Sequence, residues 1–256
     1  MMQGESPAGM IKLGLKWISI IMLISGELIM AVLLWLARPL EETTEVINEL
    51  SPEYLIAHAG GAVNGQTYTN SKTALVNALN KGFRYIELDL FKTPDGNVVC
   101  THDSSTYKIK PIMSLREAVG IWLERPFEFV VDKISEPQIL NHYFKKNREH
   151  VYVEAFCIDD YKQLKEDGYV PMLSLGGDLR GFIKYLVTSL YCGKVKRIVL
   201  YYKTPEYLLR IYKRLGAKIA VYTINDESNL KKHIGRDVDM VYTDFLIPSD
   251  LSMKHD

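Results

Sequence analysis

Short apolar runs alternate with stretches of helical periodicity over most of the chain after about residue 54. Eight of these runs have the length and composition of buried strands, and helical patterns separate most of them. Strand–helix alternation repeated eight times in about two hundred residues predicts a (β/α)8 TIM barrel, with a doubly wound open sheet as the alternative. The expected strands are Leu55–His58, Tyr85–Phe91, Phe127–Asp132, Val151–Phe156, Val170–Leu175, Arg197–Tyr202, Lys218–Thr223 and Asp239–Thr243.

Capping residues predict where several of the expected helices begin or end. Ser71–Lys81 is helical in pattern and is followed by a glycine, which suits a left-handed helix end. Ser114–Leu123 opens with a capping box in which Glu117 is the acidic member. For the helix that ends near residue 215, Thr204 is expected to be the N-cap and Pro205 the first helical residue.

A longer apolar run, Trp17–Ala37, precedes the alternating region. As a helix it would be about 30 Å long, enough to cross a bilayer. Lys12 and Lys16 precede it and glutamates follow it, so the positive-inside rule places the N-terminus in the cytoplasm. A cleaved signal peptide is the alternative, but no clear small-residue cleavage site follows the run.

The pattern therefore predicts four regions in a single-pass protein of the cell membrane. Residues 1–15 form a cytoplasmic N-terminus, 16–38 a transmembrane anchor, 39–53 a linker, and 54–256 an extracytoplasmic barrel domain. The 31 basic and 31 acidic residues balance. No basic field therefore indicates a nucleic-acid partner, and the composition leaves the oligomeric state open. Cys100, Cys157 and Cys192 match no metal-binding spacing and are expected to be buried free thiols.

Two acidic residues interrupt the second strand. Glu87 and Asp89 are two positions apart, so a strand directs both carboxylates to the same face. Pro94–Asn97 is a tight-turn signal, and a two-residue loop at its centre would place His102 opposite Asp89. One surface would then hold two oxygen ligands and an acid/base group. The simpler alternative is a hairpin whose polar face meets water.

The order of these motifs resembles the glycerophosphodiester phosphodiesterase family, within the phosphatidylinositol-specific phospholipase C-like superfamily. The resemblance is carried by I-A-H-A-G-G at residues 56–61, then T-N-S, E-L-D, T-P-D-G and T-H-D. V-Y-T-I-N-D and V-Y-T-D are similar to the family's last two strands. The resemblance extends from about Leu55 to Phe245. Ala59 replaces the arginine of the family's His-Arg-Gly loop, which indicates a divergent branch.

The resemblance implies a set of site residues. His58 and His102 correspond to the two catalytic histidines, and Glu87 and Asp89 to the first two metal ligands. Asp132 corresponds to the third ligand, with Glu154 on the next strand as the alternative. Three carboxylates form an oxygen-only site suited to Mg²⁺ or Ca²⁺.

Lys133 is the candidate for the family's substrate-binding lysine. It follows the third carboxylate by one residue where the family has two. On a regular strand it would point away from the pocket unless a bulge turned it back.

The implied function is a membrane-anchored, metal-dependent phosphoric diester hydrolase. Its substrates would be glycerophosphodiesters, lysophospholipid-like molecules or glycerol-phosphate polymers of the cell envelope. Imidazole suits both proton transfers because its pKa lies near neutrality, and the sequence leaves open which histidine is the acid. Two alternatives stay open: a degenerate barrel that only binds phospholipid or envelope polymer, and an intramolecular transfer that yields a cyclic phosphate.

Overall fold

The computed structural model describes residues 54–103, 105, 112–234 and 237–248, with six positions between 27 and 38. Residues Met1–Leu40 and Glu41–Asp256 are two compact units, and the second contains the described fold. Apart from those six positions, the predicted cytoplasmic segment, anchor and linker lie outside the described residues. Within the described part of the chain, no helix has the length and hydropathy needed to span a membrane.

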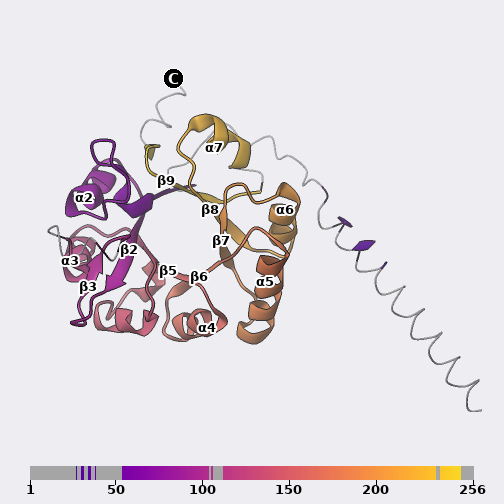
Figure 1. The fold of residues 1–256 in the computed structure, drawn as a ribbon, viewed down its shortest axis with the longest axis horizontal. Helices are drawn as coiled ribbons and strands as arrows, with labels where there is room; N and C mark the ends of the chain where they lie inside the picture. The colour runs from indigo at the N-terminus through magenta and orange to yellow at the C-terminus, as the bar shows by residue number, and fades with distance from the viewer. Residues whose placement is uncertain are drawn as a thin grey trace, which may run out of the picture. The chain divides into compact units, whose positions relative to one another are not determined.

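Eight parallel strands close into a barrel, with the helices around the outside (Figure 1). Strand β1 pairs with β9 on one side and with β2 on the other, and this double pairing closes the ring. The prediction of a (β/α)8 barrel is therefore confirmed, and the open sheet is excluded. The strands are β1 (Leu55–Ala57), β2 (Tyr85–Lys92), β4 (Glu128–Asp132), β5 (Val151–Ala155), β6 (Val170–Ser174), β7 (Arg197–Tyr201), β8 (Lys218–Tyr222) and β9 (Met240–Thr243).

Helices connect the strands as the alternating pattern predicts, except between β4 and β5. There, two 3-10 helices, Pro137–His142 and Arg148–His150, form the described connection. Another 3-10 turn, His58–Gly60, follows β1 directly. The α-helices of the barrel are α2 (Lys72–Asn80), α3 (Leu115–Glu124), α4 (Ile158–Glu166), α5 (Leu179–Cys192), α6 (Glu206–Arg214) and α7 (Glu227–His233).

Two of the three predicted helix starts are confirmed. Ser71 caps α2 by accepting a hydrogen bond from the Ala74 backbone, and Ser114 and Glu117 form a complete capping box on α3. The prediction for α6 is wrong by one residue. Pro205 has an extended ψ of 133° and is itself the N-cap, so Thr204 lies one residue further from the helix.

The hairpin of β2 and β3 (Val98–Cys100) has a three-residue loop, not the two-residue loop expected from Asp-Gly. The Thr93 amide donates to the Asn97 carbonyl at 2.8 Å, and Gly96 has a φ of +86°. The extra residue shifts the register by one. Thr101, whose amide donates to the Asp89 carbonyl at 2.9 Å, therefore lies opposite Asp89, and the predicted pairing with His102 is wrong.

The barrel interior changes from apolar to acidic toward the carboxyl ends of the strands. Its buried apolar cluster comprises Ile56, Val130, Tyr152, Met172, Val199, Ala220 and Tyr242. Two residues further along their strands, Asp132 follows Val130 and Glu154 follows Tyr152. Because side chains two apart share a face, these carboxylates point into the same interior. Functional groups in this fold gather at that end.

The three cysteines are free, as predicted, but only one of them is buried. Cys100 lies in the short strand β3. Cys157 is exposed because it is the N-cap of α4, and Cys192 is partly exposed at the last position of α5. The expectation of burial is wrong for these two because helix ends lie at the surface.

Candidate active site

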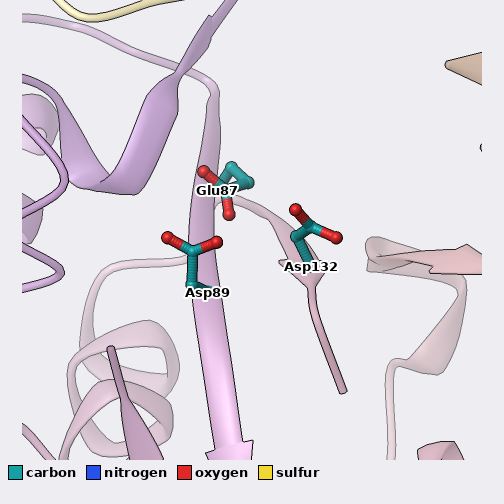
Figure 2. A group of neighbouring side chains, drawn as sticks. All are labelled: Glu87, Asp89 and Asp132. Carbon is teal, nitrogen blue, oxygen red and sulfur yellow. The ribbon is translucent and has the colours of Figure 1, made fainter. Parts of the chain in front are cut away.

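Glu87, Asp89 and Asp132 converge at the carboxyl end of the barrel (Figure 2). Asp89 of β2 is in register with Asp132 of β4. Glu87 is two residues before Asp89 on β2, so its side chain lies on the same face of the strand. One oxygen of each carboxylate lies within 4.8 Å of one oxygen of each of the others. The three residues that the sequence predicts as metal ligands are thus brought together.

The electrostatics of this cluster favour a bound cation. Glu87 is 1% exposed, and its Oε1 has no hydrogen-bond partner although it is buried. Burial and the neighbouring Asp89 raise the pKa of Glu87 well above its usual range. The same two causes raise the pKa of Asp132 to about 6. Three close acids with an unpartnered buried oxygen fit a hard divalent cation, because oxygen ligands are what Mg²⁺ and Ca²⁺ prefer.

Asp89 is held from two sides. The buried amide of Asn70 donates to Asp89 Oδ2 at 2.8 Å, and Asn70 Oδ1 accepts from the Asp89 backbone amide at 2.9 Å. On the other side, Lys133 Nζ lies 3.3 Å from Asp89 Oδ1. Asn70 is the central residue of the T-N-S motif and was not among the predicted site residues.

Lys133 reaches the site through a local change of backbone conformation. Its φ is +60°, in the left-handed region, and its amide donates to Asp132 Oδ1 at 2.6 Å. This conformation interrupts the alternating side-chain directions of β4, so the Lys133 side chain points back toward the pocket. The expectation from a regular strand, that Lys133 points away, does not hold. A left-handed residue takes the place of the bulge considered there.

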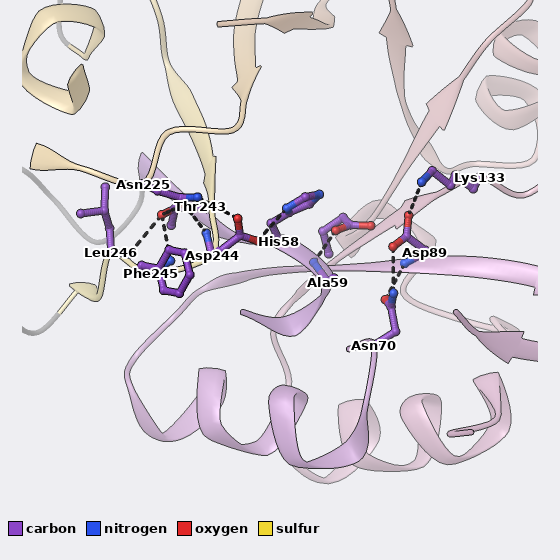
Figure 3. A network of polar contacts seen from close by, with 11 residues as sticks. His58, Ala59, Asn70, Asp89, Lys133, Asn225, Thr243, Asp244, Phe245 and Leu246 are labelled. Carbon is purple, nitrogen blue, oxygen red and sulfur yellow. Dashed lines mark hydrogen bonds and ion pairs between the residues drawn. The ribbon is translucent and has the colours of Figure 1, made fainter. Parts of the chain in front are cut away.

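His58 is oriented by residues from the other end of the chain (Figure 3). Its Nδ1 lies 2.9 Å from Asp244 Oδ1, and Asn225 Nδ2 donates to Asp244 Oδ2 at 2.8 Å. A carboxylate only accepts, so Nδ1 carries the proton and Nε2 of the neutral ring is left as a proton acceptor. Asp244 and Asn225 belong to the closing motifs, and neither was among the predicted site residues.

Tyr68 lies between the two histidines. Its ring centroid is 4.7 Å from that of His58 and 4.6 Å from that of His102, both edge to face. Tyr68 has a φ of +55°. His102 therefore reaches the site from the chain that follows β3, although it does not pair with Asp89. No sequence signal marks Tyr68, because a tyrosine with positive φ cannot be recognised from composition.

One pocket of about 260 Å³ is lined by both histidines and Tyr68, together with Lys133, Glu87 and Asp132. Glu154 also borders it, where the Tyr242 hydroxyl donates to Glu154 Oε1 at 2.6 Å. Glu154 is engaged by this bond and is not part of the close cluster, so the geometry favours Asp132 as the third ligand. The described lining residues are His58, Tyr68, Glu87, His102, Asp132, Lys133, Glu154, Phe156, Ser174, Tyr222 and Tyr242.

Residues 61–120 match the model of the Glycerophosphoryl diester phosphodiesterase family. None of the curated proteins with which the sequence was compared matches it. Among solved structures, a glycerophosphodiester phosphodiesterase from Parabacteroides distasonis has a TM-score of 0.60 at 18% identity, over 79% of this chain and 96% of that chain. The glycerophosphodiester phosphodiesterase from Thermotoga maritima has a TM-score of 0.55 at 19% identity, over 75% and 94%.

A phosphodiesterase from Oleispira antarctica, in complex with the product sn-glycerol-3-phosphate, has a TM-score of 0.60 at 17% identity, over 78% of this chain and 95% of that chain. At these identities the likeness establishes the shared fold. The family match covers the segment that holds Glu87, Asp89 and His102. This family match points to the phosphoric diester hydrolases, the class of enzyme that the sequence predicts.

Proposed function

We propose that this protein is a divalent-cation-dependent phosphodiesterase that hydrolyses glycerophosphodiesters with His58 and His102 as its acid/base pair. The supporting observation is that both histidines border one pocket at the carboxyl end of the barrel together with Glu87 and Asp132. Asp89 completes the close group of three carboxylates with these two acids. The match to the phosphodiesterase family over residues 61–120 supports the same reaction.

Glu87, Asp89 and Asp132 would hold the cation, which when bound would offset the negative charge of the phosphodiester. Asn70 and Lys133 orient Asp89 through the contacts described above. The Lys133 ammonium also borders the pocket, where it can attract a phosphoryl oxygen. This lysine partly compensates for the arginine that Ala59 replaces.

The two histidines divide the proton transfers. One takes the proton of the attacking water as its oxygen bonds to phosphorus, and the other gives a proton to the alcohol oxygen as its bond to phosphorus breaks. Asp244 keeps the Nε2 of His58 available by holding the Nδ1 proton. The products are a phosphate monoester and a free alcohol.

A catalytically inactive binding module is less well supported. Burying carboxylates without partners is costly, and a scaffold gains nothing from it. Glu87 is 1% exposed, its Oε1 has no hydrogen-bond partner, and burial raises its pKa well above the usual range. We favour the enzyme because a catalytic metal site would give the buried Glu87 carboxylate a function.

We also propose that residues 16–38 anchor the protein in the cell membrane with the barrel outside the cytoplasm. The support is the apolar run Trp17–Ala37 with its flanking charges. Protease accessibility of intact cells or spheroplasts would check this, since an extracytoplasmic barrel is cleaved while the N-terminus stays protected. Protection of the barrel would contradict the proposed orientation.

The activity is tested with the full-length chain in detergent, supplied with Mg²⁺ or Ca²⁺ and a set of glycerophosphodiesters. Phosphorus NMR separates a monoester product from a cyclic phosphate, and so separates hydrolysis from intramolecular transfer. We expect a monoester, and a loss of at least about a hundredfold in kcat for His58→Ala and His102→Ala. His142→Ala, at an exposed position in the first 3-10 helix after β4, is the matched control. No turnover, or full activity of His58→Ala, would refute the proposal.

A further inference from the structure

A second pocket of about 440 Å³ lies beside the catalytic pocket. It is bordered by the segment between β1 and α2 and by the chain near Cys100 and Met113. Tyr68 lines both pockets. Thr101, which precedes the predicted catalytic His102, also lines the second pocket. The two pockets are therefore neighbours that meet at Tyr68.

Backbone hydrogen bonds and a helix cap hold the segment that lines the second pocket. Val63 and Gln66 form two backbone hydrogen bonds of 2.9 Å each around Asn64 and Gly65. Both turn residues have positive φ, 50° and 76°, as a type I′ turn requires. The α2 N-cap Ser71 fixes the other end of the segment. The polar side chains between these points are thus presented from a defined backbone.

Amides and hydroxyls dominate the lining, and none of the described residues that line this pocket is charged. Cys100, Ile112 and Met113 add an apolar portion. Amide and hydroxyl groups both donate and accept hydrogen bonds, as do the hydroxyls of a polyol. The polar lining includes Asn64, Gln66, Thr67, Thr69, Ser71 and Thr73.

Other headgroups fit this lining less well. A quaternary ammonium is recognised by an aromatic cage, whereas Tyr68 is the one aromatic residue among the described lining residues. A primary ammonium is best matched by a carboxylate, and an anionic polymer by arginine or lysine. None of these groups belongs to the described lining.

We propose that the second pocket binds the alcohol esterified to the phosphate and selects a neutral polyol, such as a glycerol or inositol headgroup. This inference rests on the proposed phosphodiesterase function and names the substrate class of that site. Gln66, Thr67 and Thr73 determine the selectivity through hydrogen bonds to the polyol hydroxyls.

The test compares kcat/KM of the full-length enzyme for glycerophosphoglycerol and glycerophosphoinositol with that for glycerophosphocholine and glycerophosphoethanolamine. We expect the polyol diesters to be preferred. Removing one hydrogen bond typically changes discrimination by about tenfold, so Gln66→Ala and Thr73→Val should each lower the polyol-to-choline ratio by about that factor. Gln138→Ala, an exposed glutamine outside both pockets, should keep the wild-type ratio.

Preference for the choline or ethanolamine diester, or variants that keep the wild-type ratio, would overturn this inference while leaving the phosphodiesterase intact. If no diester is cleaved, the proposed function fails, and the pocket is then tested by binding alone. Saturation-transfer NMR should show contact with the headgroup of glycerophosphoinositol that is weakened in Gln66→Ala. Equal signals from glycerophosphocholine, or no effect of the substitution, would overturn the inference in that case as well.

Discussion

His58 depends on a carboxylate that lies 186 positions away in the chain. Asp244 accepts from His58 Nδ1, and Asn225 binds Asp244 through both its side-chain atoms. This arrangement fixes the tautomer and the direction of the imidazole. At the residue scale, the protein therefore has a positioning system for one of its two proposed proton carriers.

Asp244→Asn tests that system. The amide can donate to Nδ1 and so favour the wrong tautomer, and we expect kcat to fall about 10- to 1,000-fold with little change in KM. The pH profile of kcat should change as well, which a loss of folding alone would not produce. Asp159→Asn, at an exposed position on α4, is the control. A variant with wild-type kcat and pH profile would contradict the role assigned to Asp244.

Lys133 combines a function with an unfavourable backbone conformation. A non-glycine residue with a φ of +60° costs about 1 kcal/mol, whereas glycine adopts it without strain. We therefore expect Lys133→Gly to keep or raise Tm while kcat/KM falls about tenfold, because the ammonium beside Asp89 is lost. Lys133→Ala should lose the same activity without the gain in stability. Wild-type kinetics in both variants would show that Lys133 does not contact the substrate.

At the scale of elements, the β2–β3 hairpin determines where the catalytic segment begins. Its loop has three residues because a turn begins at Thr93 and Gly96 then takes a positive φ. In this turn the Gly96 amide donates to the Thr93 carbonyl at 2.9 Å. Asp-Gly is compatible with this loop and with the shorter one, so the sequence does not separate them. The difference of one residue changes which side chain faces Asp89.

Two glycine substitutions test this account of the loop. An added Cβ at Gly96 or at Gly120 of α3 meets nothing within 4 Å, so only the backbone conformation distinguishes the two positions. We expect Gly96→Ala to destabilise the protein by about 1 kcal/mol, because alanine disfavours positive φ. Gly120→Ala should stabilise it by about 0.5 to 1 kcal/mol, because alanine favours the helix. Urea unfolding measures both, and equal shifts would contradict the loop assignment.

At the scale of the whole molecule, barrel closure concentrates acidic groups in a buried volume. Strands that are far apart in sequence contribute Glu87, Asp89, Asp132 and Glu154, and their mutual repulsion adds to the cost of burial. The stability of the whole barrel should therefore depend on protons and on divalent cations.

Without a cation, the free energy of unfolding should fall as pH rises from about 4 to about 6. The folded state keeps a proton on Asp132, whose pKa is raised from 3.8 to about 6, while the unfolded state has released it. The folded state thus binds more protons across this window, and the loss is on the order of 2 to 3 kcal/mol. Mg²⁺ or Ca²⁺ should raise Tm at pH 7.5, and less at pH 5 because protons compete.

Asp132→Asn is the informative variant for this behaviour. It removes the titrating group, so the stability profile should be flatter between pH 4 and pH 6 and the cation should raise Tm by less. Calorimetry with and without a chelator measures both effects. A wild-type stability that rises with pH through this window would contradict the raised pKa of Asp132. A Tm that the cation does not change would contradict the metal assignment.

The sequence by itself determined the strand–helix order, most helix starts and the identity of the acidic and histidine residues. These features follow from local rules: periodicity, capping and the alternation of side chains along a strand. It also indicated the class of enzyme, because the opening motifs are close together and ordered along the chain.

Only the tertiary structure decided the hairpin register, the return of Lys133, and the partners Asn70, Tyr68, Asn225 and Asp244. The partners depend on contacts between distant segments, and the return of Lys133 depends on a positive φ at a residue that is not glycine. The hairpin register could not be predicted because Asp-Gly is compatible with both loop lengths. The site is complete only when β9 closes against β1, because that closure brings Asp244 to His58. Local pattern specifies the parts of such a site, and closure of the barrel specifies their geometry.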